Sequence, residues 1–363
     1  MQSQRFGFID WFRGLACILM IQTHAYDAWT AEPYRQGTWW IWARLKLGGL
    51  PARMFLFLAG VSLAMRFASD VRRSVPLAEA RLGAFWRGLE VLLIGYGYRI
   101  AEWLLAGAKT KDAMAMLKVD VLQCIGLSLM ITAYVASPRD LQDSTPQRLP
   151  WRPLGLALLV AAITPQLQKL GTPDGPGPLL AYLWPGAHPL GQFPLLPWLS
   201  YTLTGAAVGA LWLRAARNER LGQAMLWTVG AGVVVWLCGY GLEKLHLPIF
   251  SSTRTVKVEP PSIFFYRTAF CLVGTAASYL IERLKLTDGF SPTRLLGQAS
   301  LVVYMVHLDI VYNSAPYTIK QKLDPLTASM LWVVVAILMV VVAWFRVESD
   351  RKPEPAARPA LPS

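Results

Sequence analysis

The sequence predicts an all-α fold, a polytopic membrane bundle of about ten transmembrane helices, and two observations carry this prediction. Apolar residues make up 54% of the 363 residues and charged residues only 16%, whereas soluble domains carry about 25% charge. Apolar stretches close to the roughly 20 residues that a spanning helix needs also recur along the whole chain. This composition excludes a disordered chain, a coiled coil and a disulfide-stapled secreted module.

The predicted spans are separated by more polar links. They lie near residues 8–29, 50–68, 84–106, 117–136, 153–170, 194–213, 224–243, 262–281, 295–314 and 326–345. The first span starts like a signal peptide, but Asp10 and Arg13 interrupt its apolar stretch and no small-residue cleavage pattern follows. We therefore expect one transmembrane domain over residues 1–345 and a disordered cytoplasmic tail over residues 346–363.

The charge balance predicts the orientation of these spans. The chain carries 35 Lys+Arg against 22 Asp+Glu, a net charge of +13. With both termini inside, the inner links hold more Lys and Arg than the outer ones, as the positive-inside rule requires. We expect an N-in/C-in protein of the inner membrane of a bacterium, with the lipid bilayer and not nucleic acid as the partner of its basic residues.

The first predicted span carries a polar stripe. At about 100° per residue, Arg13 and His24 lie within about 20° of each other, and Asp10, Cys17 and Asp27 fall on the same side. Each charge near the centre of a spanning helix costs roughly 2.5–3.5 kcal/mol, so such residues face the bundle interior and are often functional. Arg13 and His24 are separated by about 16 Å along the axis and mark two depths of one path.

Two interpretations of this stripe stay open. In the chemical one, Arg13 attracts a phosphate-bearing donor, and a neutral His24 takes a proton from a hydroxyl or amine that attacks an activated acyl group. In the structural one, Asp10 and Arg13 form an i,i+3 ion pair, and His24 only hydrogen-bonds a neighbouring helix.

Polar residues in two later spans have the same two interpretations. Asp120 and Gln123 share one face at the start of the fourth span, where they either orient a substrate or His24, or hydrogen-bond between helices. Ser300, Tyr304 and His307 share a face of the ninth span, as polar packing or as cavity lining. No G-x-S-x-G nucleophile elbow accompanies them.

A cluster of arginines lies on the predicted cytoplasmic side. Arg72, Arg73, Arg81 and Arg87 either contact lipid headgroups or dock a polyanionic cofactor, and Arg87 is expected to pair with Glu90. The four cysteines all fall in predicted spans without a CxxC pair, which predicts buried free thiols and no metal site.

An ordered set of motifs resembles the heparan-α-glucosaminide N-acetyltransferase-like family of transmembrane acyltransferases. The matching segments, over about residues 5–313, are Arg5-x4-Asp10-x2-Arg13-Gly14-Leu15-Ala16-x2-Leu19-Met20, Phe55-Leu56-Phe57-Leu58-Ala59-Gly60-Val61-Ser62, Val121-Leu122-Gln123-x-Ile125-Gly126, Phe193-Pro194-Leu195-Leu196-Pro197-Trp198 and Leu296-Gly297-x2-Ser300-Leu301-x2-Tyr304-x2-His307. Arg13 and His24 also have the Arg-x10-His spacing of the related acyltransferase-3 proteins.

The resemblance implies transfer of an acyl group from cytoplasmic acetyl-CoA, or another acyl-CoA, to a sugar, glycan or glycolipid reached from the other side. The heparan acceptor itself is not carried over. A eukaryotic lysosomal enzyme that resembles this chain has Asn where His24 stands, and the family usually has Arg where this chain has Cys124. A homodimer is left open. A rival function is a transporter or lipid flippase without acyl chemistry, and a third is a non-catalytic sensor.

The hypothesis assigns a role to each candidate residue. His24 is the general base, oriented by Asp27 or Asp120. The donor is held by Arg13, Arg72, Arg73 and Arg87, and the acceptor by Asp10, Gln123 and His307.

Overall fold

The computed structural model describes residues 6–105, 110–136, 150–169, 182–183, 191–247, 260–286, 289–314 and 318–350. Within these ranges the chain forms helices and links, with isolated bridges but no β-strand. The all-α prediction is therefore confirmed. The chain divides into two compact units, a first unit of Met1–Ile9 and Gly49–Leu286 and a second unit of Asp10–Gly48 and Thr287–Ser363.

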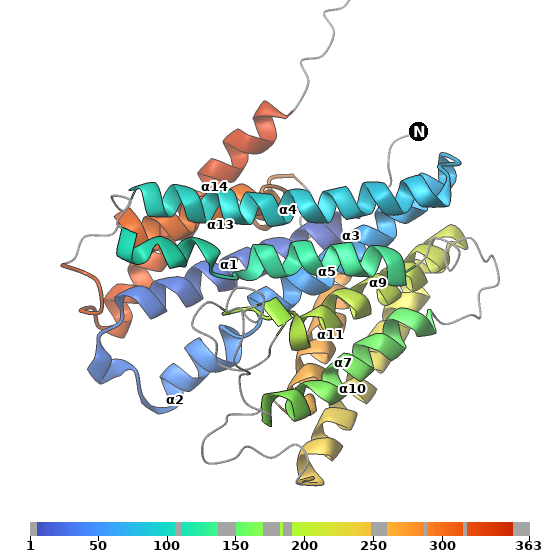
Figure 1. The fold of residues 1–363 in the computed structure, drawn as a ribbon, viewed down its shortest axis with the longest axis horizontal. Coiled ribbons are helices and arrows are strands. Elements are labelled where there is room, and N and C mark those ends of the chain that lie inside the picture. The colour runs from blue at the N-terminus through green and yellow to red at the C-terminus, as the bar shows by residue number, and fades with distance from the viewer. Residues whose placement is uncertain are drawn as a thin grey trace, which may run out of the picture. The chain divides into compact units, whose positions relative to one another are not determined.

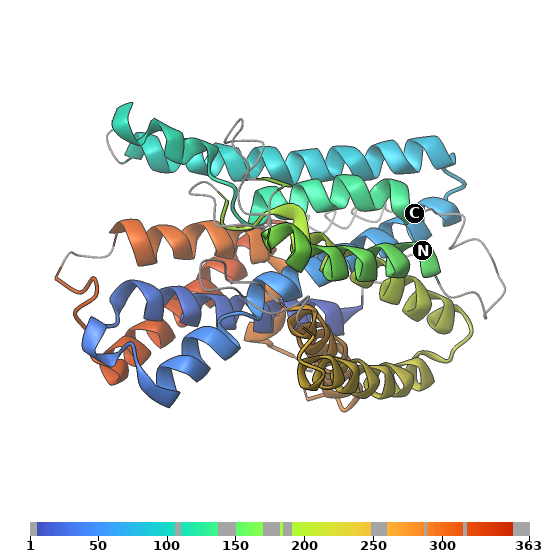
Figure 2. The same ribbon diagram turned by 60° about the horizontal axis from the view of Figure 1, so that its bottom comes forward.

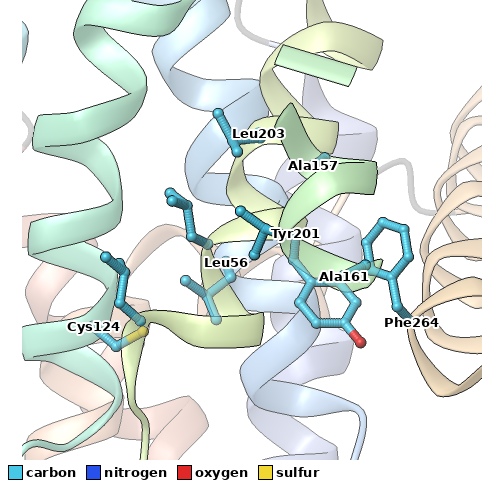
Figure 3. Packing of buried hydrophobic residues seen from close by; sticks show 10 residues of the cluster. Leu56, Cys124, Ala157, Ala161, Tyr201, Leu203 and Phe264 are labelled. Carbon is cyan, nitrogen blue, oxygen red and sulfur yellow. The ribbon is translucent and has the colours of Figure 1, made fainter. Parts of the chain in front are cut away.

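The first unit contains seven long helices along the described part of the chain. They are α3 (Pro51–Arg72), α4 (Leu77–Leu105), α5 (Val121–Val135), α7 (Trp151–Lys169), α9 (Leu195–Arg217), α10 (Leu221–Lys244) and α11 (Pro261–Arg283), with a 3-10 segment, η3 (Thr110–Leu117). Helices α4 and α5 lie side by side, as both views show (Figure 1, Figure 2). Buried residues from α3, α5, α7, α9 and α11 form one hydrophobic cluster, which includes Leu56, Tyr201 and Phe264 (Figure 3).

The second unit is more irregular. It contains most of α1 (Gly7–Trp29), then η1 (Glu32–Tyr34), α2 (Gly37–Trp40), α12 (Pro292–Gln298), α13 (Ser300–Leu308) and α14 (Pro325–Ser349). Two segments are π-helical, η2 (Ile41–Leu47) and η5 (Asp309–Ser314). The sequence predicts one straight span over residues 295–314, but the chain bends by 89° between α12 and the helix that begins at Ser300.

Glycines allow close helix crossings within each unit. A methyl group on Gly14 of α1 would lie 1.7 Å from the backbone oxygen of Thr293 in α12, and one on Gly297 would lie 1.8 Å from the oxygen of Asp10. In the first unit, a methyl group on Gly60 of α3 would lie 2.0 Å from the oxygen of Thr202 in α9. Small residues that bring backbones together are typical of helix packing in membranes.

Among the residues that the structure describes, four helices are long and apolar enough to cross a membrane, namely α3, α10, α11 and α14, and the bent pair α12–α13 is a fifth candidate. The most apolar windows of α10 and α14 are only 17% and 22% buried. Apolar surface that stays outside the protein core suits contact with lipid. The protein is therefore an integral membrane protein. The other predicted spans are helical in the described residues, but they are not both long and apolar enough to meet the same criterion.

The cysteine prediction holds for three of the four residues. Cys17, Cys124 and Cys271 are buried free thiols, whereas Cys238 is a free thiol exposed on α10. Helix α14 continues to Ser349, so the prediction of a disordered tail is wrong for residues 346–349, and residues 351–363 lie outside the described residues.

Candidate functional site

Two histidines from distant parts of the sequence meet in the second unit. Nδ1 of His24 lies 2.9 Å from Nε2 of His307, and the two rings are nearly parallel, at an interplanar angle of 5°. His24 is half-buried near the end of α1, and His307 is fully buried in the last turn of α13. The structure thus pairs two residues that the sequence placed in separate roles, one as base and one as acceptor ligand.

Aromatic rings hold the histidine pair in place. Tyr304 packs edge-on against His307, with 5.9 Å between ring centroids, and Tyr312 packs at a tilt against His24, at 5.7 Å. Nε1 of Trp29, the last residue of α1, donates to the backbone oxygen of Val311 at 3.2 Å. The end of α1 is therefore fixed to η5, the π-helical segment that follows His307. Short π-helical segments are rare and occur frequently at functional sites.

Asp27 lies one turn beyond His24 but is held by other residues. Its carboxylate accepts from Nε of Arg44 in η2 at 3.0 Å and from the hydroxyl of Tyr312 at 3.4 Å. Its backbone oxygen accepts from Arg35 at 2.6 Å. Among the described residues no hydrogen bond joins Asp27 to His24, so orientation of His24 by Asp27 stays a prediction. The sequence predicts no role for Arg44 and Tyr312, because nothing local links them to Asp27.

Asp10 and Arg13 form the expected i,i+3 ion pair near the start of α1. Nη1 of Arg13 lies 3.2 Å from the carboxylate of Asp10, which is buried, while the Arg13 side chain stays 22% exposed. The pair lies beside the close crossing of Gly14 and Gly297, where α1 contacts α12. This ion pair agrees with the structural interpretation of Arg13, and its contact with a donor stays a prediction.

Asp120 and Gln123 belong to the first unit, where they cap α5. The Asp120 side chain accepts from the backbone N–H of Val121, and the Gln123 side-chain oxygen accepts from the backbone N–H of Asp120 at 3.2 Å, as part of a capping box. Arg99 of α4 forms a further ion pair with Asp120 and donates to Glu102. These contacts give both residues a structural role, and their roles in catalysis and acceptor binding stay predictions.

The arginine cluster lies at the end of α3 and the start of α4, both in the first unit. Arg72, Arg73 and Arg87 are exposed. Arg87 donates to Glu90 at 2.7 Å, as the sequence predicts. Arg72 and Arg73 form no ion pair with another described residue, and their binding of a donor phosphate stays a prediction. The described residues contain no group of three or more His, Cys, Asp or Glu side chains that could hold a metal ion.

Comparison with known proteins gives the family of the chain. The model of the family described as heparan-alpha-glucosaminide N-acetyltransferase, catalytic, matches residues 5–247, which is more than half of the chain. No curated protein matches the chain. The match covers α1 with His24 and ends before α13, so the motif around His307 lies beyond it. The chain belongs to the family of heparan-alpha-glucosaminide N-acetyltransferase catalytic domains, a family of membrane acetyltransferases.

Proposed function

We propose that the protein transfers an acyl group, acetyl in the first instance, from acyl-CoA to a hydroxyl or amine of a sugar, glycan or glycolipid. One observation carries the proposal: a half-buried histidine on the first helix of an acetyltransferase-family chain is hydrogen-bonded to a second, buried histidine. Neutral imidazole is the side chain best suited to accept and return a proton near neutral pH.

The proposed step moves one proton through His24. The acceptor oxygen or nitrogen attacks the thioester carbonyl carbon, its O–H or N–H bond breaks, and the proton binds the imidazole of His24. The C–S bond then breaks, and the CoA thiolate leaves and takes up the proton from His24. The acceptor gains an acyl group, CoA leaves as the thiol, and the histidine returns to its starting state.

The donor and acceptor are proposed to approach from opposite faces of the membrane. We place both termini and the arginine cluster on the cytoplasmic side of a bacterial inner membrane, because Arg-rich links favour that side. The proposed donor-binding residues are Arg72, Arg73 and Arg87 in the first unit and, separately, Arg13 in the second. The proposed acceptor-binding residues are Gln123 in the first unit and, separately, Asp10 in the second. Reporter fusions to the C-terminus test this orientation: activity of a cytoplasmic reporter supports it, and activity of an exported reporter contradicts it.

The reaction is tested with the purified full-length protein in lipid nanodiscs. Isotope-labelled acetyl-CoA and a membrane glycan fraction are supplied, CoA thiol is titrated, and products are examined by mass spectrometry. We expect CoA release in step with a product heavier by one acetyl group. Transport or flipping of the glycan without CoA release would overturn the proposal and favour a transporter.

A further inference from the structure

The hydrogen bond between the two histidines continues to a backbone carbonyl. Nδ1 of His307 lies 2.8 Å from the backbone oxygen of Val303, one turn earlier on α13. A carbonyl oxygen has no hydrogen to donate, so the hydrogen of this bond is on Nδ1 of His307. In this hydrogen bond, therefore, His307 donates and the Val303 carbonyl accepts.

The burial of His307 determines which histidine donates in the contact between His24 and His307. His307 is fully buried, and its described hydrogen-bond partners are a carbonyl oxygen and the imidazole of His24. A buried imidazolium without an anion is costly, so the ring is neutral and its Nε2 carries a lone pair. Nδ1 of His24 must then donate to Nε2 of His307 across the 2.9 Å contact. In the neutral state this leaves the lone pair of His24 on its Nε2.

We propose that His307 is a positioning residue, which holds His24 in the Nδ1–H form so that it accepts the substrate proton on Nε2. The proposal rests on the proposed acyl transfer. In the Ser-His-Asp triad a carboxylate performs the corresponding task. Here a neutral acceptor performs it, which avoids placing an anion in a membrane-spanning segment, where a charge is expensive.

Proton and charge balance follow from this arrangement. When the acceptor attacks the thioester, its proton binds Nε2 of His24, and the ring becomes an imidazolium whose Nδ1–H still donates to His307. A hydrogen bond from a charged donor is roughly twice as strong as a neutral one, so the contact strengthens while the charge is present. The proton then moves to the CoA sulfur. His307 stays neutral throughout and exchanges no proton.

The local packing supports orientation as well as protonation. The near-parallel rings, with Tyr304 against His307 and Tyr312 against His24, restrict rotation of both side chains. The π-helical segment η5 begins two residues after His307. A side chain that served only to fill space would not need a ring nitrogen directed at His24.

The test compares two substitutions of His307 with a control on the same helix. His307→Gln keeps an oxygen that accepts from His24, whereas His307→Leu keeps only bulk. Ser300→Ala changes a polar residue of α13 that lies outside the pair. We expect His307→Leu to lower kcat by about 10- to 100-fold with an unchanged KM for acyl-CoA, and His307→Gln to restore most of the rate. Equal activity of the Leu variant and the Ser300→Ala control would overturn the proposal.

A second measurement, of the tautomer of His24, does not depend on acyl transfer. The chain has four histidines, so the ring signals of a ¹⁵N-histidine-labelled protein can be assigned by single substitutions. We expect Nδ1 of His24 to be protonated in the wild type and in His307→Gln, and the other tautomer to appear in His307→Leu. An unprotonated Nδ1 in the neutral wild-type ring would overturn the proposal even if acyl transfer occurs. A protein with the expected signals but without acyl transfer would instead contradict the proposed function.

Discussion

Asp27 is the residue on which the irregular segments around His24 converge. Arg44 from η2 and Tyr312 from η5 both contact its carboxylate, and Arg35 contacts its backbone oxygen. The side chains of Asp27 and Arg44 are 37% and 34% exposed, so this ion pair contributes at most about 1 kcal/mol to stability. Its main effect is geometric, because it holds two π-helical segments beside the histidine pair.

A second carboxylate, Asp324, makes the start of α14 sensitive to acid. Its side chain accepts from the backbone N–H groups of Leu326 and Thr327 and from the Thr327 hydroxyl at 2.6 Å, and these hydrogen bonds lower the pKa of Asp324 below the ordinary aspartate value. The ionised form is therefore favoured by folding. Its stabilisation is complete above the pKa of the unfolded chain and is lost as the pH falls through the lowered pKa.

The expected result is selective acid opening of the first turn of α14. The protection of its first amides against hydrogen exchange, measured relative to the unfolded chain at the same pH, should fall below about pH 4 in the wild type, near the ordinary aspartate pKa. Asp324→Asn, which keeps an N-cap oxygen without a titrating group, should lose this pH dependence. An identical pH profile in both proteins would contradict the assignment.

At the scale of elements, the glycine crossings explain why motif glycines recur in this chain. Gly14→Ala in α1 should lower thermal stability, because the new methyl group lies 1.7 Å from the backbone oxygen of Thr293 and the helices must move apart. We expect a cost of about 1–3 kcal/mol. Gly97→Ala is the matched control, since a methyl group there meets nothing within 4 Å. Equal melting temperatures of the two variants in detergent would contradict this account of the crossing.

The arginine cluster gives a prediction for the donor-binding element. The double variant Arg72→Ala, Arg73→Ala should raise the KM for acyl-CoA on the order of 10-fold, because two exposed charge contacts of up to about 1 kcal/mol each are lost. The wild-type KM should rise with salt, and the variant should respond less. The control removes two other exposed charges, Arg220 and Lys285. Equal KM values in the two double variants would exclude the cluster as a phosphate site.

Sequence alone predicts the helices and the polar stripe because both are local features. Long apolar runs specify the helices, and the positions of Asp10, Arg13 and His24 follow from helical periodicity. The capping box of Asp120 and Gln123 was also readable, since an acidic residue followed three positions later by Gln before an apolar run is an N-terminal helix signal. The shared face of Asp120 and Gln123 instead suggests either a role at the site or hydrogen bonds between helices.

The pairing of His24 with His307 could not be predicted, because 283 positions separate the two residues and no local pattern connects them. The 89° bend at the start of α13 is not predictable for a similar reason, since the apolar composition continues through it. Arg99 was detectable as a charge inside a predicted span, but its partner Asp120 comes from the packing of α4 on α5. Tertiary contacts, and not local propensity, decide these features.

At the scale of the whole molecule, the charge distribution and the family point to the same kind of protein. A chain with few charges and a net charge of +13 has apolar helices for the bilayer and exposed arginines for the membrane surface or an anionic donor. The family to which the chain belongs is one of membrane acetyltransferases, which agrees with this charge distribution. Asp10, Arg13 and Asp27 are the charged residues of α1 and His24 is its histidine, and the proposed chemistry depends on them.

The activity of a His24→Ala variant is the most direct test of the central claim. CoA release and acceptor acylation are measured in nanodiscs for this variant and for His246→Ala, which removes an exposed histidine after α10. If His24 is the general base, its removal lowers kcat by about 10²- to 10⁴-fold, while His246→Ala keeps the wild-type rate. A correctly inserted His24→Ala protein that acylates the acceptor at the wild-type rate would contradict the account.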